Sequence, residues 1–374
     1  RRHRSRQPGI MRPVLAATNP QMMGPFWTNG IATLYQSDAR QIPIPDQSVH
    51  CVVTSPPYFG LRVYRSDSDA MIGLEETVQG WIDSMLEVMA EVGRVLRDDG
   101  VLWVNLGDSY TGNPSSGGAN ANDGGPPVRL ENMRTKTGQS GQLLMIPARF
   151  ALAMQDAGWI LRSDVIWAKK SCMPESLNGT RWEGDTLRRG SWRCTSSHEH
   201  IFQFVKSMGY YSDGEAVKTE SNANRRNVWS DISPEPYGGE HYATFPSDLP
   251  RLCIQASTSE AGVCAECGSQ WARVVEHTNM GITRSGNEGN AGTRTMICGT
   301  MDTPSTTKTL SWRPTCTCNA DKVPATVLDC FAGTGTTLLA AMRLGRRSVG
   351  VDLSPDYLGQ AVKRLEKQSL PMLI

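Results

Sequence analysis

Two short segments of this 374-residue chain carry residue types that could act together on an amino group. The first has the sequence Thr-Ser-Pro-Pro-Tyr over residues 54–58 and follows the apolar run Val49–Val53. The second has the sequence Asp-Cys-Phe-Ala-Gly-Thr-Gly-Thr-Thr over residues 329–337 and follows the run Val323–Leu328. Each segment has the pattern of a strand that ends at a loop. If the loops meet, one could hold an amine and the other a nucleotide-like cofactor that the amine attacks.

The first loop has the chemistry to orient a planar base. Pro56 and Pro57 fix φ and remove two N–H donors, so the carbonyl oxygens have no competing donors beside them. We expect a base to stack on Tyr58 while the Ser55 hydroxyl and the Pro56 carbonyl accept the hydrogens of its exocyclic amine. These bonds would free the nitrogen lone pair for in-line attack on a methyl sulfonium, so that positioning and local electrostatics do the catalysis.

The second loop has the features of a nucleotide-binding turn. Gly333 and Gly335 bracket it, and a helix is expected to begin at about Thr336 with its free N–H groups facing a ligand. Asp352 ends the next strand at the spacing expected for a carboxylate that binds ribose. A third glycine is absent, since Leu338 stands in its place. The pattern therefore favours a nucleotide-like ligand over a dinucleotide; the alternative is a plain turn without a ligand.

The segments around these loops predict a mostly parallel sheet. A helix over Glu75–Arg97 lies between the strand candidates Val49–Val53 and Val101–Leu106, which makes a β–α–β unit. Gly100 is expected to end that helix. Further candidates are strands at 31–35, 159–167, 200–205 and 348–351, and helices at 147–157 and 336–344.

Four cysteines fall in two close pairs, Cys264 with Cys267 and Cys316 with Cys318. Two such pairs can supply the four thiolates of a structural zinc site. The single-residue spacing of the second pair is less usual, so Cys298 is an alternative ligand, and unpaired thiols are the alternative to a metal site. The ten cysteines otherwise lie scattered, which favours a reducing compartment over a secreted disulfide scaffold.

The overall charge sets a limit on how a polyanion could be bound. The net charge is +1, so a polyanion would need local patches. Arginines beside Trp182 and Trp192 suit phosphate contact and base stacking, although a solvated loop is an equal alternative; they are Arg181, Arg188, Arg189 and Arg193. No apolar run reaches the ~20 residues of a membrane helix, and no charged-then-apolar leader is present, so we expect a cytoplasmic protein without membrane contact.

Together the two loops resemble the amino-group DNA methyltransferases. Their signatures are an (Asp/Asn/Ser)-Pro-Pro-(Tyr/Phe) loop and a Phe-x-Gly-x-Gly loop, and here both occur in the order of the β-type permutation. The resemblance covers residues 31–252 and 323–367. It implies a Rossmann-like α/β fold, circularly permuted, and a target base flipped out of the duplex. The cysteine-rich, zinc-ribbon-like segment lies between the two covered ranges, as an insert that the family motifs flank.

The resemblance assigns roles to residues across the chain. Ser55, Pro56, Pro57 and Tyr58 would be catalytic. S-adenosylmethionine would be held by Asp38, Phe245, Pro246, Asp329, Phe331, Gly333, Gly335, Thr336 and Asp352, with the segment His241–Leu252 closing over its methionine end. Independently of the resemblance, the cysteine spacing predicts that zinc would be held by Cys264, Cys267, Cys316 and Cys318.

The expected organisation has four parts. They are a basic tail at 1–25, a catalytic domain at 26–259 and 323–374, a mobile loop at 113–140 inside that domain, and the cysteine-rich insert at 260–322. The insert is a candidate for reading DNA sequence or for dimer contacts. The irregular, polar segment Lys170–Ser197 competes for the same role.

The predicted activity is site-specific methylation of an exocyclic amine in double-stranded DNA by a bacterial, archaeal or phage enzyme. Ser55 favours cytosine N4, because serine is commoner there in the cytosine enzymes of this family and aspartate in the adenine enzymes. Adenine N6, RNA or a protein glutamine as the acceptor, and an inactive DNA-binding module, are the alternatives. A homodimer and a cognate restriction endonuclease are the partners left open.

Overall fold

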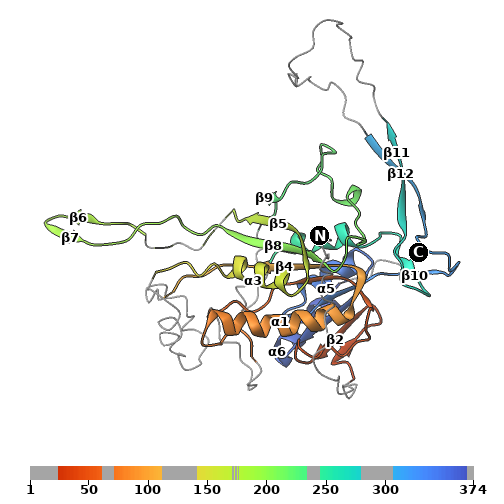
Figure 1. Ribbon diagram of the computed structural model, residues 1–374, viewed down its shortest axis with the longest axis horizontal. Helices are drawn as coiled ribbons and strands as arrows, with labels where there is room; N and C mark the ends of the chain where they lie inside the picture. Colours follow the sequence, from red (N-terminus) through yellow and green to blue (C-terminus); the bar gives the residue numbers. More distant parts are fainter. Residues whose placement is uncertain are drawn as a thin grey trace, which may run out of the picture.

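A nine-stranded mixed sheet forms the centre of the protein (Figure 1). The computed structural model describes residues 24–60, 71–111, 141–170, 172, 175, 177–233, 245–278 and 306–368. The strand order is β1-β2-β15-β14-β3-β4-β8-β5-β9. Their bounds are β1 Trp27–Thr28, β2 Ala32–Gln36, β3 Val49–Thr54, β4 Leu96–Leu106, β5 Ile160–Ala168, β8 His198–Val205, β9 Val228–Trp229, β14 Thr326–Asp329 and β15 Arg347–Asp352. The strands from β2 to β4 run parallel, and β8 is antiparallel to both β4 and β5.

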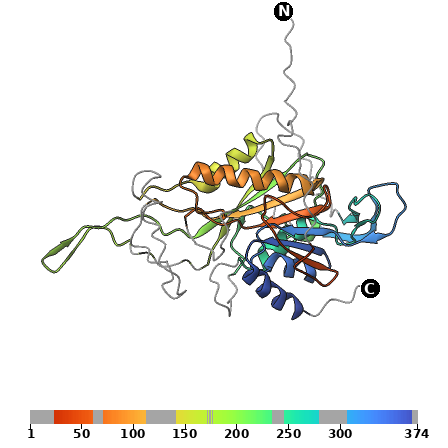
Figure 2. The same ribbon diagram turned by 90° about the horizontal axis from the view of Figure 1, so that it is seen from below.

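Helices cover both faces of this sheet (Figure 2). On one face lie α1 (Val78–Val95) and α3 (Ile146–Asp156), and on the other lie α4 (Asp248–Ser257), α5 (Thr336–Arg343) and α6 (Pro355–Glu366). Adjacent residues of a strand point to opposite faces, so Val52 packs in the core under α1 and Val53 in the core under α4 and α5. Because both faces are buried, most residues of the central strands are apolar, which is why these strands are visible in the sequence.

Helix α1 confirms the helix predicted over Glu75–Arg97, but its end differs from the prediction. Thr77 caps the helix by accepting the Gly80 N–H at 3.0 Å, and Trp81 is among the side chains that it buries. The helix ends at Val95 and β4 begins directly at Leu96, so Gly100 lies inside the strand rather than ending the helix. A Cβ at Gly100 would lie 2.5 Å from a Leu96 methyl group, which explains the glycine by close packing.

Two hairpins leave the sheet in different directions (Figure 1). One pairs β6 (Arg181–Glu183) with β7 (Thr186–Arg188), so the prediction of irregular chain over Lys170–Ser197 is wrong there. The other pairs β11 (Ala272–Thr278) with β12 (Thr306–Arg313) inside the cysteine-rich insert, whose ends are joined by β10 (Val263–Cys264) and β13 (Lys322–Val323).

Several expectations fall outside the described residues. They concern residues 1–23 of the basic tail, the loop 113–140, His241 and Cys298. Among the described helices, none has both the length and the apolar character needed to cross a membrane.

Candidate active site

The two loops singled out in the sequence leave the same edge of the sheet side by side. Strands β3 and β14 are parallel neighbours, with Val52 opposite Leu328. At their carboxyl ends the Thr54 hydroxyl donates a hydrogen bond of 2.7 Å to Asp329 Oδ1. Ligands of open α/β sheets bind outside the carboxyl ends of the strands. The structure therefore brings the candidate amine loop and the candidate cofactor loop together at such an edge.

Asp329 joins the two loops from a buried position. Besides the Thr54 hydroxyl it accepts the Phe331 N–H at 3.1 Å, and its residue is 2% exposed. Burial raises the pKa of Asp329 to about 6, against the hydrogen bonds that favour its charged form. The carboxyl thus fixes the relative position of the loops rather than offering itself to a ligand.

We expect Asp329→Asn to become progressively more stable than wild type as the pH rises from about 4 to about 6. In that window the folded wild type still binds a proton that the unfolded chain has released, so its free energy of unfolding falls with rising pH. The asparagine has no charge to bury and keeps an oxygen for Thr54 and Phe331. Melting temperatures of both proteins between pH 4.5 and 7.5 test this; parallel curves, or the same divergence for exposed Asp356→Asn, would contradict it.

The amine loop presents its predicted acceptors without competition. The Trp81 indole N–H from α1 donates to the Pro57 carbonyl at 3.0 Å, which holds the loop against the core. Within the described part of the chain, neither the Ser55 hydroxyl nor the Pro56 carbonyl has a hydrogen-bond partner. Two acceptors therefore remain for an amine, which is the arrangement that the sequence predicts.

The ring of Tyr58 is held by a polar network that the sequence does not reveal. Its hydroxyl donates to Glu199 Oε2 at 2.9 Å, and the Asn105 amide donates to the same Glu199 oxygen at 2.7 Å and to the Tyr58 hydroxyl at 3.1 Å. Lys169 forms an ion pair with the other Glu199 oxygen. A Cβ at Gly107 would lie 2.8 Å from the Tyr58 ring, so only glycine leaves room for the ring in this position.

The side-chain oxygen of Asn105 differs from its amide nitrogen in its hydrogen bonding. The residue is 3% exposed, and its Oδ1 atom is buried without a hydrogen-bond partner among the described residues. A buried polar atom without a partner is uncommon in a native protein and indicates a missing ligand or water. Within the described residues, Asn105 thus takes part in the network beside Tyr58 through its amide N–H groups.

The cofactor loop has the backbone geometry that its glycines predict. Gly333 and Gly335 have φ of 49° and 78°, and a Cβ at Gly333 would meet nothing within 4 Å. Asp352 accepts the Gly333 N–H at 2.8 Å and the Ser354 N–H at 2.9 Å, so it braces the turn, and burial raises its pKa. Half-buried Phe331 packs against the core under α1.

The remaining residues predicted to hold the cofactor have partners within the protein. Asp38 lies just beyond β2, near the turn of Asp352, and is paired with Arg40 at 2.7 Å. Thr336 receives a hydrogen bond of 3.1 Å from Arg364. Phe245 packs against the core under α4 and α5, and the carbonyl of Pro246 accepts the Leu249 N–H at the start of α4.

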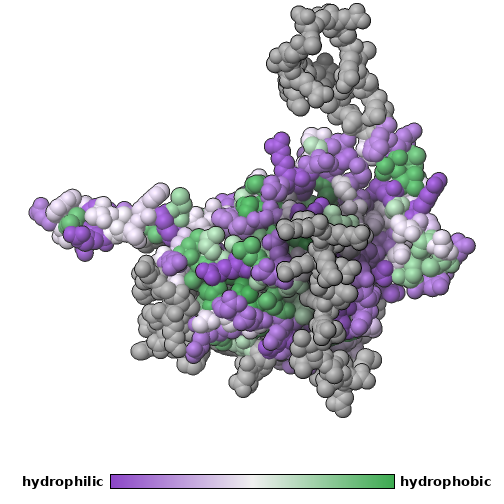
Figure 3. All heavy atoms as spheres, in the orientation of Figure 1, coloured by the Kyte–Doolittle hydropathy of each residue, from purple (hydrophilic) through white to green (hydrophobic). Residues whose placement is uncertain are grey.

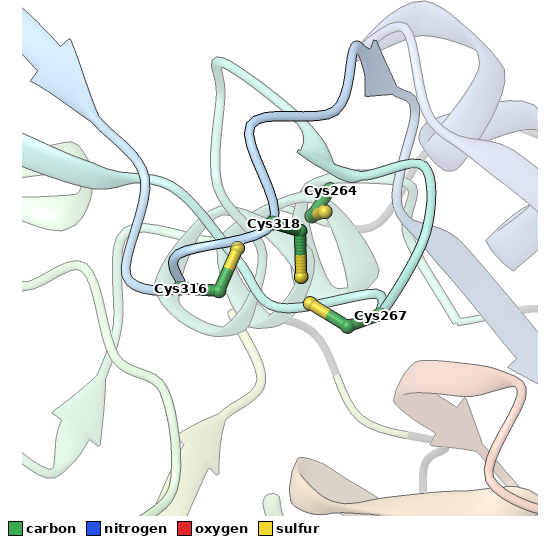
Figure 4. A group of neighbouring side chains, drawn as sticks. All are labelled: Cys264, Cys267, Cys316 and Cys318. Carbon is green, nitrogen blue, oxygen red and sulfur yellow. The ribbon is translucent and has the colours of Figure 1, made fainter.

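The four predicted cysteine ligands converge (Figure 4). The Sγ atoms of Cys264, Cys267, Cys316 and Cys318 all lie within 4.8 Å of one another.

This cysteine cluster lies at the edge of the sheet opposite the two loops. Next to Cys267, the Gly268 carbonyl accepts a hydrogen bond of 3.0 Å from His50 Nε2, at the start of β3. The other nitrogen of His50 accepts the Thr326 N–H at 3.1 Å, at the start of β14. Burial lowers the pKa of His50 to about 4, so it stays neutral and serves both bonds.

Two further polar side chains, His200 and Asp108, have partners within the protein. His200 is hydrogen-bonded to Asp164 at 2.9 Å, and within the described residues it belongs to no cluster of metal-binding groups. Asp108 accepts the Ile146 N–H at 3.1 Å and so caps the start of α3. Neither residue lies in the network around Tyr58.

Sequence comparison gives this geometry a family. A protein-family model described as DNA methylase matches residues 49–266 and 319–363, which include both loops. The chain belongs to the N4/N6 DNA methylase family. It is therefore a DNA methyltransferase that uses S-adenosylmethionine, and its mixed α/β sheet is the Rossmann-like fold of such enzymes.

Individual relatives match this chain over nearly its whole length. The Type II methyltransferase M.Cfr9I of Citrobacter freundii is 34% identical over 351 residues, which cover 91% of this chain and 90% of the relative. The Type II methyltransferase M.SmaI of Serratia marcescens is 31% identical, with 88% of each chain covered. The fold of the PvuII DNA methyltransferase (cytosine-N4-specific) is similar, with a TM-score of 0.53 at 18% identity, covering 94% of this chain and 90% of that one.

Proposed function

We propose that this DNA methyltransferase modifies N4 of cytosine in a specific duplex sequence. Serine at position 55 favours cytosine, and the free acceptors of Ser55 and Pro56 support an exocyclic amine as the group that is bound. The single observation that carries the proposal is the Thr54–Asp329 bond, because it joins the amine loop to the cofactor loop.

The proposed mechanism uses each residue of the amine loop. The flipped base stacks on Tyr58, while the Ser55 hydroxyl and the Pro56 carbonyl accept the two amine hydrogens and turn the nitrogen lone pair out of the ring plane. The Trp81 indole N–H donates to the Pro57 carbonyl, and this bond holds the loop in one position relative to α1. No covalent intermediate with the enzyme is needed.

The cofactor turn fits an S-adenosyl group. Open space over Gly333 lets a ligand approach the backbone, the start of α5 offers N–H groups, and Phe331 offers an apolar face. S-adenosylmethionine, when bound, supplies an electrophilic methyl group. We assign Asp352 and Gly335 to shaping this site, and Asp38, paired with Arg40, to its adenine end.

We also propose that the fold is circularly permuted. The cofactor strand β14 is the neighbour of the catalytic strand β3 in the sheet, yet β14 follows β3 by most of the chain. A parallel sheet that binds a nucleotide at its first strand would have β14 early in sequence. The order of the elements therefore supports the β-type permutation.

Incubation of unmethylated DNA with tritiated S-adenosylmethionine tests the activity. After digestion to nucleosides, mass spectrometry should find N4-methylcytosine in wild-type reactions and none with Ser55→Ala. N6-methyladenine would overturn the base assignment, and no transfer to DNA at all would overturn the proposal. Long-read sequencing of the product would give the recognition site. Because the relatives are named Type II methyltransferases, we propose that methylation of this site blocks a companion restriction endonuclease.

We propose that the cysteine cluster binds structural zinc. Thiolates about 2.3 Å from zinc have sulfur–sulfur distances of about 3.8 Å, which the mutual approach of these four Sγ atoms allows. Four thiolates close the coordination sphere, and the cluster lies at the far edge of the sheet, so its role is to hold the fold together.

Metal analysis should therefore find about one zinc per chain. Cys264→Ser should lose the metal and lower the melting temperature by about 5–10 °C, as expected for about 2–4 kcal/mol in a domain of this size. The matched control is Cys194→Ser, because Cys194 is an exposed free thiol. Wild-type protein without zinc, or equal melting temperatures for the two variants, would contradict the assignment.

A further inference from the structure

The β6–β7 hairpin stands far out from the body of the protein (Figures 1 and 2). We call residues 177–192 the ribbon. Trp182 and Leu187 face each other across its two strands and are 68% and 38% exposed, and Trp192 is 73% exposed. Figure 3 shows an apolar spot near its end, surrounded by hydrophilic atoms. Large exposed aromatic side chains on a projecting element mark a binding surface.

The ribbon starts at the edge of the sheet that carries the active site. Strand β8 begins opposite the carboxyl end of β4, where His200 pairs with Leu106, and β5 ends beside it, where Ala168 pairs with His198. The chain leaves β5 into the ribbon and returns into β8. The cysteine cluster lies at the opposite edge, so the ribbon is better placed than the cysteine-rich insert to reach DNA at the active site.

The root of the ribbon is tied to the ring that would stack the base. Lys169, next to the end of β5, pairs with Glu199 of β8, and Glu199 holds the Tyr58 hydroxyl. In the segment that returns from β7 to β8, Arg193 pairs with Glu175 and lies over the Tyr110 ring at 3.8 Å. The Lys169–Glu199 and Arg193–Glu175 ion pairs therefore fix the direction in which the ribbon leaves the protein relative to Tyr58.

The charge of this segment suits a polyanion. Between residues 169 and 197 six basic residues stand against three acidic ones, while the whole chain has a net charge of +1. The basic residues are Lys169, Lys170, Arg181, Arg188, Arg189 and Arg193. Near the tip Arg188 pairs with Glu183, and exposed Arg189 has no partner among the described side chains.

We infer that the ribbon lies in the major groove of the DNA duplex beside the base that is methylated. The inference rests on the proposed function. The major groove is about 12 Å wide and admits a two-stranded β-ribbon, whereas the minor groove of regular B-DNA is only about 6 Å wide. Arg188 and Arg189 contact phosphate or guanine edges, and Trp182 and Leu187 make the apolar contacts to the bases.

Binding measurements on the full chain test this placement. Fluorescence anisotropy would compare wild type with Trp182→Ala and with the double variant Arg188→Ala, Arg189→Ala on a duplex that carries the mapped site. Each contact is worth about 1–3 kcal/mol, so we expect the Kd for DNA to rise by about tenfold or more in each variant. For the double variant the slope of log K against log salt should fall by about 2. Arg347→Ala, an exposed arginine away from the ribbon, is the control.

Two further measurements separate the outcomes. Dimethyl sulfate attacks guanine N7 in the major groove, so wild type should protect guanines that the ribbon variants leave reactive. Affinity for S-adenosylmethionine by calorimetry should be unchanged in the variants. The inference would be overturned if both variants kept the wild-type DNA affinity, salt slope and guanine protection. It would also be overturned if a variant bound DNA normally but lost self-association on gel filtration. Failure of wild type to methylate DNA would instead overturn the proposed function.

Discussion

Tyr58→Ala should lower methyl transfer to DNA by about 10²–10³-fold while leaving the Kd for S-adenosylmethionine within about twofold. Stacking of a base on an aromatic ring is worth about 1–3 kcal/mol. Loss of the ring also releases Glu199 and Asn105, which would misplace the bound amine, and small misplacements cost about 10²-fold. Single-turnover transfer of tritium and calorimetry of cofactor binding measure the two quantities separately.

Variants that keep the ring separate its two contributions. Tyr58→Phe retains the stacking surface but loses the hydroxyl's bonds to Glu199 and Asn105, so its rate should fall by about tenfold, less than for Tyr58→Ala. Glu199→Gln keeps a side chain of the same shape but weakens the pair with Lys169, and its effect should resemble that of Tyr58→Phe. If Tyr58→Ala weakens cofactor binding as much as it slows methyl transfer, Tyr58 is not the stacking residue.

Asp352→Ala should weaken binding of S-adenosylmethionine by about 10–100-fold. Its carboxyl accepts the N–H groups of Gly333 and Ser354, and each hydrogen bond to a charged group contributes about 1.5–3 kcal/mol. Without them the turn that shapes the cofactor site loses its brace. Calorimetry with S-adenosylmethionine measures the affinity, and a thermal melt shows whether the fold survives.

The control for this prediction is Asp356→Ala, an exposed carboxyl in the first turn of α6. It should bind the cofactor with wild-type affinity. Asp352→Asn keeps one accepting oxygen, so its affinity should lie between wild type and alanine. Equal affinities for Asp352→Ala and Asp356→Ala would show that the turn does not depend on the carboxyl.

The sequence predicts the core strands and both loops because their signals are local. Val49–Val53 and Val101–Leu106 are apolar on both faces, and they become the central strands β3 and β4. The glycines of the cofactor loop predict a tight turn, and in the structure Gly333 and Gly335 adopt positive φ there. Close cysteine pairs predict a cluster, and the four Sγ atoms converge.

The residues that sequence reasoning missed act over long distances along the chain. Tyr58 meets Asn105 and Glu199 only because β3, β4 and β8 come to lie near one another, and no local pattern records that pairing. Asp38 forms its ion pair with Arg40, which is only two residues away. Oppositely charged residues this close together on a loop do not by themselves predict an ion pair. The ribbon was missed because its strands are short and exposed on both faces, so no apolar alternation marks them.

The position of the cysteine cluster bears on how this protein could be engineered. Cys264 and Cys267 precede β11, and Cys316 and Cys318 follow β12, so the cluster joins the two ends of the β11–β12 arm close to His50 and the start of the sheet. The arm is attached a second time beyond the cysteine cluster, because Arg273 of β11 pairs with buried Asp213 at 2.9 Å and Lys218 donates to Thr307 of β12 at 3.3 Å. A fusion partner placed in this arm would therefore be carried by a segment that is anchored at two points, both remote from the Tyr58 network.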